Sequence, residues 1–405
     1  MKSPKIAIIH DYLNAYGGQE AVTSAIWELW PNAPIYTALW DPAVFKKTRT
    51  LQGAKIVVPK WATSKFVNRF YKYFTFLYPI VFERLDLSKF DIVISSSANF
   101  AKGVITKPTQ LHISYIHTPP RFLYGYPTES SKRDNLLWKP ILKIVDYFLL
   151  RWDQKAAQRP DFLLCNSKEV RDRIKRLYKR DAKIIYPFIN IQNAKGDKAA
   201  PTTQAELARR CGRGNLEDGE NTGEKEEYYL TVTRMSLYKH VDKAILACAR
   251  LGRKLKVAGS GKEFERFKKI AESCGGDIEM LGFVSENQKA DLYKNCRALI
   301  HPVEFEDFGM TPLEAMYLGK PAIVPNQGGF KDTVIDGYNG VFSKSSSVTD
   351  LSEAILRFEE LEKRVNWEKN CKETASRFTK ERFKKEFKGF VEKSWENFEM
   401  SVQNA

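Results

Sequence analysis

Apolar and polar positions alternate along the first half of the chain in short blocks that predict strands separated by helices. The strand candidates are short, apolar and rich in β-branched residues, as buried parallel strands are. They lie at 5–10, 34–39, 55–58, 91–97, 111–117, 161–167 and 183–188. Helical spacing of apolar residues falls between them, for example over 20–30 and 135–158. Strands that alternate with helices predict a doubly wound parallel sheet.

The same pattern starts again after a polar segment. Residues 191–227 contain no aromatic residue and are rich in Gly, Asn, Asp, Glu, Lys and Ala, which predicts an exposed linker or insert. Further strands are expected at 228–234, 254–259, 278–284, 298–303 and 321–325. Helices are expected at 241–250, 262–274, 286–295 and 311–318. The charged tail over 351–400 carries an aromatic stripe at helical spacing.

These blocks predict an α/β protein with two Rossmann-like domains that face a central cleft. The first domain is expected at 1–190 and the second at 228–375, joined by the polar linker at 191–227. Residues 376–405 are expected to form a helix that packs back on the first domain. Ligands of such sheets bind at the carboxyl ends of the strands, so the cleft is the expected site.

The positive charge of the chain is concentrated in its first half. The formal net charge is +16, and residues 1–190 carry 30 Lys/Arg against 15 Asp/Glu, so the first half holds nearly all of it. Within that half, the segment 60–85 places aromatic residues at helical spacing with lysines and an arginine between them. Such a segment suits a membrane interface, or else it is a surface helix that packs its aromatics inward. Nucleic acid, an anionic membrane or a phosphorylated substrate would each explain the charge.

Neither a membrane span nor a metal motif is visible in the sequence. The apolar stretch 141–150 carries Lys143 and Asp146 and is shorter than the ~20 residues of a spanning helix. The six cysteines lie far apart without a CxxC pair, which disfavours zinc and redox motifs. The N-terminal residues read as a first strand rather than as a signal peptide. Together with the sparse cysteines, this predicts that the protein is located in the reducing cytoplasm.

The strongest candidate chemistry lies in residues 301–329. An expected strand ends in an acidic loop, and Gly309 with Thr311-Pro312 then opens a helix. A helix N-terminus that faces the cleft offers free N–H groups to a phosphate. Glu306 precedes this helix and Glu314 lies inside it, so two carboxylates are available for different roles.

Other strand ends add cations, glycines and a histidine. The strand at 228–234 ends in Arg234, and Lys239 follows five residues later, so two cations are available to an anionic ligand at this strand end. Candidate turns that let the backbone approach a ligand closely are Gly259-x-Gly261 and Gly17-Gly18 before Glu20. His117 ends the strand at 111–117 and is followed by Thr118-Pro119-Pro120-Arg121. His10, His112, His240 and His301 are interpreted as structural.

Together these motifs resemble the retaining glycosyltransferases of the GT-B type, in the large family four (glycosyltransferase group 1) that includes bacterial mannosyltransferases. The matching elements are E-D-F-G-M-T-P-L-E at 306–314, G-K-P-A-I, the Gly328-Gly329 turn, the R-x4-K pair, G-x-G and G-G-x-E. The H-T-P element followed by an aromatic residue resembles the subgroup that builds O-antigen and capsule polysaccharides.

The resemblance implies a role for each element. Arg234 and Lys239 would bind the donor diphosphate, Glu314 the ribose, and Glu306 and His117 would lie beside the donor sugar. Further donor contacts, through the backbone or at glycine turns, would come from Gly17, Gly18, Gly259, Gly261, Phe308, Gly309, Met310 and Thr311. Neither a metal nor a cofactor is implied.

We therefore expect transfer of a sugar, with retention of configuration, in surface polysaccharide synthesis. The donor is expected to be GDP-mannose first and a UDP-sugar second, and the acceptor a glycan or a lipid diphosphate at the inner face of the cell membrane. A nucleotide-sugar epimerase on the same fold is the first rival. A nucleic-acid-binding protein is the second, and it is disfavoured because no nucleic-acid module is visible and Glu306-Asp307 would repel phosphates.

Overall fold

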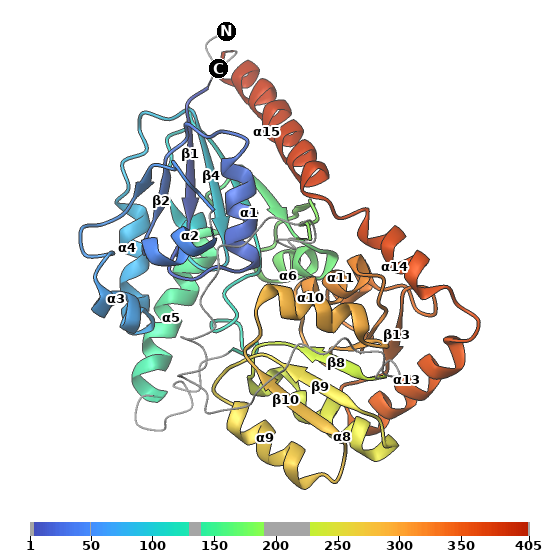
Figure 1. Ribbon diagram of the computed structural model, residues 1–405. Helices are drawn as coiled ribbons and strands as arrows, with labels where there is room; N and C mark the ends of the chain where they lie inside the picture. The colour runs from blue at the N-terminus through green and yellow to red at the C-terminus, as the bar shows by residue number, and fades with distance from the viewer. Residues whose placement is uncertain (1–3, 49, 129–138, 190–226, 404–405) are drawn as a thin grey trace.

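The computed structural model describes residues 4–48, 50–128, 139–189 and 227–403. Its first domain is built on a seven-stranded parallel sheet in the order β3-β2-β1-β4-β5-β6-β7 (Figure 1). The strands are β1 (Ile6–His10), β2 (Ile35–Thr37), β3 (Ile56–Val57), β4 (Ile92–Ser97), β5 (Leu111–Ile116), β6 (Phe162–Cys165) and β7 (Lys183–Ile184). β1 and β4 are buried on both faces, which is why they read as continuous apolar or small-residue runs.

Helices cover both faces of this sheet. They are α1 (Gly18–Trp27), α2 (Pro42–Thr48), α3 (Lys65–Phe70), α4 (Tyr78–Glu83), α5 (Lys139–Ala156) and α6 (Lys168–Tyr178), with 3-10 turns η1 (Tyr71–Leu77) and η2 (Ala101–Gly103). Alternate residues of β1 point to opposite faces: Ile6 and Ile8 pack with α1, whereas Ala7 and Ile9 pack with α4 and α5. The sheet is therefore the middle layer of three.

The second domain repeats the design with a six-stranded parallel sheet in the order β10-β9-β8-β11-β12-β13. The strands are β8 (Tyr229–Val232), β9 (Leu255–Ala258), β10 (Ile278–Gly282), β11 (Leu299–Ile300), β12 (Ala322–Pro325) and β13 (Gly340–Ser343). The helical segments are η4 (Leu237–Lys239), α8 (Val241–Leu251), α9 (Phe264–Ser273), α10 (Glu286–Asn295), α11 (Met310–Tyr317), α12 (Phe330–Thr333), α13 (Val348–Leu361) and α14 (Trp367–Ala375). The expected fold class is confirmed, although β13 was not expected from the sequence.

The last helix, α15 (Lys380–Gln403), returns to the first domain, as expected (Figure 1). Phe383 and Phe387 are buried in the core of the first sheet, where both rings approach Tyr115. Lys380 and Lys384 hold Glu28 of the first domain at 2.5 and 3.2 Å. The aromatic stripe of the tail thus belongs to the first domain's core.

The aromatic segment at 60–85 is not one helix, contrary to the pattern at helical spacing. It breaks into α3, the 3-10 turn η1 and α4. Pro79 lies in the first turn of α4, where its missing N–H costs nothing, but it could not continue a helix from the preceding turn. No described helix is long and apolar enough to cross a bilayer.

Both sheets reverse their strand order at one point, between β1 and β4 and between β8 and β11. At such a point the loops that follow neighbouring strands part to opposite sides and leave a crevice at the carboxyl edge. The linker expected at 191–227 lies outside the described residues apart from Glu227.

Candidate functional site

The switch point of the second sheet brings a cation, a carboxylate and a histidine together. Lys239 ends η4, after β8, and its Nζ lies 3.2 Å from Oε2 of Glu306, in the loop after β11. Nε2 of His301 lies 4.0 Å from the same oxygen. Burial tends to raise the pKa of Glu306, but Lys239, His301 and Arg121 overcome it and lower this pKa to about 2. Glu306 is therefore an anion at every physiological pH.

Arg234 follows the same strand as Lys239 and is exposed. The segment that carries it is fixed from one side by the glycine turn after β9. A Cβ at Gly259 would lie 1.8 Å from the carbonyl oxygen of Thr233, and one at Gly261 would lie 2.4 Å from that of Met235. Because these two positions are glycines, the loop after β9 can pack directly against the loop after β8, which carries Arg234.

The loop that carries Glu306 is closely held by a second glycine turn. Gly329 donates its N–H to the carbonyl oxygen of Glu306 at 2.9 Å, and a Cβ at Gly329 would lie 2.4 Å from Cα of Phe308. Phe305 has φ of 57°, a left-handed conformation that costs a bulky residue energy. Such a conformation persists only where the surroundings impose it, and it gathers at functional sites.

Helix α11 begins directly after this loop. Its N-cap is Gly309, with φ of 93° and no side-chain cap, so the first N–H groups at Met310 and Thr311 have no side-chain acceptor at the cap residue. The side chain of Phe308 is buried and stacks on Tyr186, so only its backbone is available to a ligand. An uncapped helix start of this kind suits an anion.

Glu314 lies inside α11 and pairs with α10 rather than with the cation at 239. Nζ of Lys289 is 3.3 Å from its Oε2, and the Tyr293 hydroxyl donates to the same oxygen at 3.3 Å. Burial raises the pKa of Glu314 despite Lys289. The two glutamates of the E-x7-E element therefore differ in environment, as two separate roles require.

The first sheet places His117 at the end of β5, in a buried chain of polar groups. Nδ1 of His10 donates to the carbonyl oxygen of Ser96 at 3.0 Å and also lies 3.0 Å from the Thr23 hydroxyl. Thr23 donates to the carbonyl of Gln19, so it accepts from the Ser96 hydroxyl, which in turn accepts from Nε2 of His117, both at 2.8 Å. These directions leave Nδ1 of His117 as the acceptor. Burial, helped by His10, lowers the pKa of His117 to about 3, so it is neutral.

His10, interpreted from the sequence as structural, thus contacts the expected site. Its Nε2 lies 3.6 Å from Oε1 of Glu20, the acidic residue of the Gly17-Gly18 turn. Gly17 is the N-cap of α1, and a Cβ at Gly18 would meet no atom within 4 Å, so this turn is open to a ligand. The neighbouring Asp11 instead holds the loop after β4, because its carboxylate accepts four backbone N–H groups from residues 98–101.

The His10–Glu20 pair predicts a pH-dependent stability. Burial opposes a charge on His10, but the carboxylates of Glu20 and Asp11 outweigh it and raise its pKa. A raised folded-state pKa stabilises the protein below the ordinary value near 6.5 and loses that contribution as the pH rises through the folded-state value. The wild-type melting temperature should therefore fall more between pH 6 and pH 9 than that of His10→Asn. Identical pH dependence in the two proteins would contradict the pairing.

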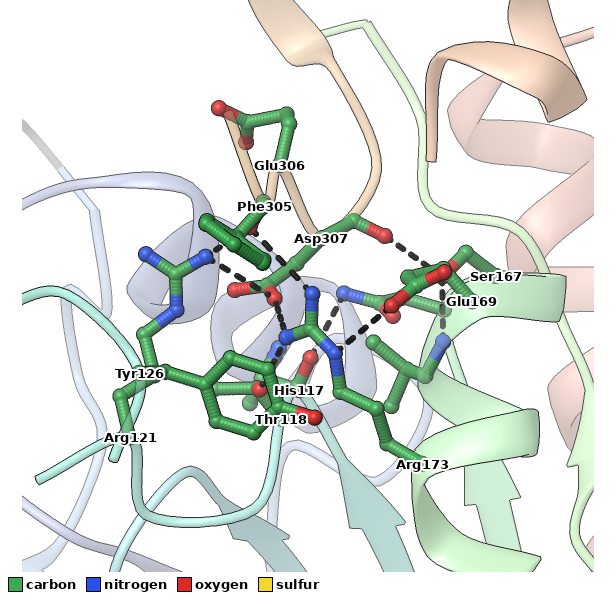
Figure 2. Close-up of polar contacts among 12 residues, drawn as sticks. His117, Thr118, Arg121, Tyr126, Ser167, Glu169, Arg173, Phe305, Glu306 and Asp307 are labelled. Carbon is green, nitrogen blue, oxygen red and sulfur yellow. Dashed lines mark hydrogen bonds and ion pairs between the residues drawn. The ribbon is translucent and has the colours of Figure 1, made fainter. Parts of the chain in front are cut away.

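Two arginines of the first domain contact the Glu306 loop of the second domain directly (Figure 2). Arg173, on α6, donates to Asp307 and, at 3.3 Å, to the carbonyl oxygen of Phe305. Arg121 donates to the same carbonyl, and its guanidinium lies 3.4 Å from Asp307. Ser167 donates to the carbonyl of Asp307 at 2.5 Å. The sequence predicted neither Arg173 nor Asp307 as a site residue.

The structure thus gathers Lys239, Glu306 and the start of α11 at one end of the second sheet. His117 with the Gly17-Gly18 turn lies at the matching end of the first sheet. Among the described residues, no three His, Cys, Asp or Glu side chains are grouped to hold a metal ion.

The sequence is similar to those of known glycosyltransferases. Residues 213–374 match the family described as glycosyl transferases group 1. An uncharacterized glycosyltransferase of Methanocaldococcus jannaschii is 34% identical over 148 residues, which cover 36% of this chain and 42% of that protein. The match thus spans less than half of that relative's length. The human alpha-1,3/1,6-mannosyltransferase ALG2 is 23% identical over 390 residues, covering 88% of this chain and 87% of that protein.

The fold comparison extends over nearly the whole chain. The Anabaena protein HepE, solved in complex with UDP, superposes with a TM-score of 0.64 at 16% identity, covering 96% of this chain and 100% of that one. Residues 213–374 thus resemble glycosyl transferases of group 1 in sequence, and almost the full length of the chain shares the fold of HepE.

Proposed function

We propose that the protein transfers a sugar from a nucleotide-sugar donor, bound mainly by the second domain, to an acceptor bound by the first. The observation that carries this proposal is the arrangement at the second switch point. Lys239, Glu306 and the uncapped start of α11 follow neighbouring strand ends. Cations and free N–H groups suit a diphosphate, and a fixed carboxylate suits the hydroxyl groups of a sugar.

In this proposal the protein stabilises the charge of the leaving group. When the glycosidic bond breaks, negative charge grows on the departing diphosphate. We propose that Lys239, Arg234 and the first N–H groups of α11 surround this diphosphate and stabilise the transition state without reorganising. The acceptor oxygen bonds to the anomeric carbon on the face from which the diphosphate departs, so configuration is retained. The proton of the acceptor hydroxyl passes to the leaving phosphate, and the protein's cations and N–H groups take the place of a metal. Neutral His117 then accepts a hydrogen bond at Nδ1 rather than carrying charge.

GDP-mannose is the donor we propose first, because the H-T-P element at 117–119 resembles that of mannosyltransferases and the chain is similar to ALG2 over most of its length. A UDP-sugar is the second candidate, because HepE, of similar fold, was solved with UDP. The acceptor we propose is a glycan or a lipid diphosphate of surface polysaccharide synthesis.

A panel of GDP- and UDP-sugars tests this function. The purified protein should be stabilised against thermal unfolding by one base series, and it should release that nucleoside diphosphate when an acceptor glycan or lipid is added. Formation of the epimeric nucleotide sugar from donor alone would instead assign an epimerase. Absence of any stabilisation across both series would reject a nucleotide-sugar site.

We also propose that the first domain lies on an anionic membrane at the cytoplasmic face. Large apolar side chains are exposed on α3 and α5: Phe66 by 64%, Ile144 by 62% and Phe148 by 66%. These helices lie on one side of the first domain (Figure 1), and Trp152 of α5 donates to Glu83 of α4 at 2.7 Å. The first half also carries nearly all of the net positive charge, and each basic residue near an anionic leaflet contributes roughly 1 kcal/mol.

Vesicle sedimentation tests this membrane surface. The protein should bind vesicles that contain phosphatidylglycerol much more strongly than neutral ones, and added salt should weaken that binding. The pair Ile144→Ser/Phe148→Ser should reduce binding about 100-fold or more, because each apolar side chain that leaves water contributes roughly 1.5–3 kcal/mol. The matched control, Phe283→Ser/Leu356→Ser, removes exposed apolar side chains from the second domain and should leave binding unchanged. Equal losses in both pairs would contradict this surface.

A further inference from the structure

We infer that Arg173, assisted by Arg121, is a positioning residue that couples the closure of the two domains to the placement of Glu306. The inference rests on the proposed function, because it assigns to the first domain a part in building the donor site of the second. The residues concerned are drawn together in Figure 2.

Arg173 is buried to an unusual degree for an arginine, with 1% of its side chain exposed. Within its own domain it contacts Glu169 at 2.9 Å and lies 4.5 Å from the ring centre of Tyr126. Its remaining N–H groups reach Thr118, at 3.3 Å, and the loop of the other domain. The planar guanidinium can hold several acceptors at fixed angles, which the single ammonium of a lysine cannot.

The loop that carries Glu306 is contacted both by its own domain and by the first domain. On the second-domain side, the Gly328-Gly329 turn binds the carbonyl oxygen of Glu306. On the first-domain side, the polar contacts go to the carbonyl of Phe305 and to both the carboxylate and the carbonyl of Asp307. The residue with the left-handed backbone, Phe305, is itself held by the first domain through its carbonyl oxygen. Contacts from the first domain therefore contribute to imposing a conformation that the loop would not favour alone.

Neighbouring carboxylates in this loop point to opposite sides (Figure 2). Asp307 points to the arginines of the first domain, whereas Glu306 points away from them and pairs with Lys239. Because the two residues are adjacent, a shift of Asp307 shifts the backbone of Glu306. Separating the domains would remove the arginines from Asp307, so Glu306 is fully positioned only when the domains are closed.

This coupling predicts a specific defect in two variants made from opposite domains. Arg173→Met removes the hydrogen bonds that Arg173 donates to Asp307 and to the carbonyl oxygen of Phe305. Asp307→Asn removes the negative charge that pairs with the arginines but keeps the contacts to the backbone of the loop. Arg171→Met is the matched control, since Arg171 lies on the same helix, is 40% exposed and pairs with the adjacent Asp172. Amide hydrogen exchange over residues 301–310, the radius of gyration from X-ray scattering, and steady-state kinetics are measured for all three.

Both variants should speed exchange over 301–310 by about tenfold or more and increase the radius of gyration. They should lower kcat by about 10²-fold, the size expected when a reacting group is misplaced by ~1 Å, with a smaller change in the donor KM. The control should match the wild type in each measurement. If Arg173→Met does not fold, Asp307→Asn alone carries the test.

The outcomes separate this inference from the proposed function. Folded variants with wild-type exchange over 301–310, or with kcat unchanged, overturn the positioning role. A wild-type protein that transfers no sugar from any donor rejects the proposed function, whereas faster exchange and a larger radius of gyration would still establish the contact between the domains.

Discussion

Replacing Lys239 with methionine is expected to slow sugar transfer by about 10²- to 10³-fold, the cost of removing one fixed donor of charge stabilisation. The ammonium is lost from the place where charge develops on the diphosphate, and Glu306 loses its partner at 3.2 Å. Arg234→Ala should likewise lower kcat far more than it weakens donor binding, because the cation acts mainly in the transition state.

The pH dependence distinguishes this effect from general damage. In the wild type, the pKa of Glu306 is about 2, because Lys239, with His301 and Arg121, overcomes burial. The stabilisation from this lowered pKa is present above the unfolded-state value near 4.5 and is lost as the pH falls through about 2. Without Lys239, burial raises the pKa, so the variant should lose kcat/KM at a higher pH than the wild type does.

Rates of donor turnover between about pH 4.5 and pH 9 provide the measurement. Lys243→Met is the matched control, because Lys243 lies on α8, is 39% exposed and pairs with Asp242. It should retain the wild-type rate and pH profile. A Lys239→Met protein with wild-type turnover would remove the cation at 239 from the proposed mechanism.

Substituting Asp153 with alanine is expected to destabilise the first domain by about 3–5 kcal/mol, the range for breaking a buried ion pair from one side. Its Oδ1 lies 2.5 Å from Nζ of Lys102, and both side chains are 1% exposed. The hydroxyls of Tyr124 and Tyr178 each donate to Oδ2 at 2.8 Å. The substitution removes the carboxylate that pairs with the buried ammonium of Lys102. It also removes the acceptor through which α5 contacts the two tyrosine hydroxyls.

Urea unfolding of single and double variants tests the assignment. The pair Lys102→Met/Asp153→Leu should recover the part of the loss that comes from the unpaired charge of Lys102, since it removes both charges and fills the space with apolar atoms, although the two tyrosine hydroxyls still lack this acceptor. Asp172→Ala, on the exposed face of α6, is the control and should change the free energy of unfolding by less than ~0.5 kcal/mol. A small effect of Asp153→Ala, with an unchanged urea midpoint, would show that the pair does not stabilise the domain.

The strands of both sheets could be predicted from the sequence because buried parallel strands appear as short, mostly apolar runs. Runs such as Ile6–His10 and Leu111–Ile116 are buried throughout and are mostly apolar, with only His10, His112 and Ser114 as polar members. β13 was missed because Gly340–Ser343 is short and begins with glycine. The break in the segment 60–85 was missed because aromatic spacing persists through a 3-10 turn, although Pro79 was the available signal.

The alternation of apolar and polar segments along the chain is enough to predict the fold class and the strand ends. It also predicts the elements around the candidate residues Arg234, Lys239, Glu306, Glu314 and His117. Which of several similar residues contact the other domain depends instead on how the domains pack. Helix α6 carries Arg171, Arg173 and Arg176, which look alike in sequence. Contact between residues 134 positions apart selects Arg173 for Asp307, because domain packing, not local pattern, sets which charge is buried against which.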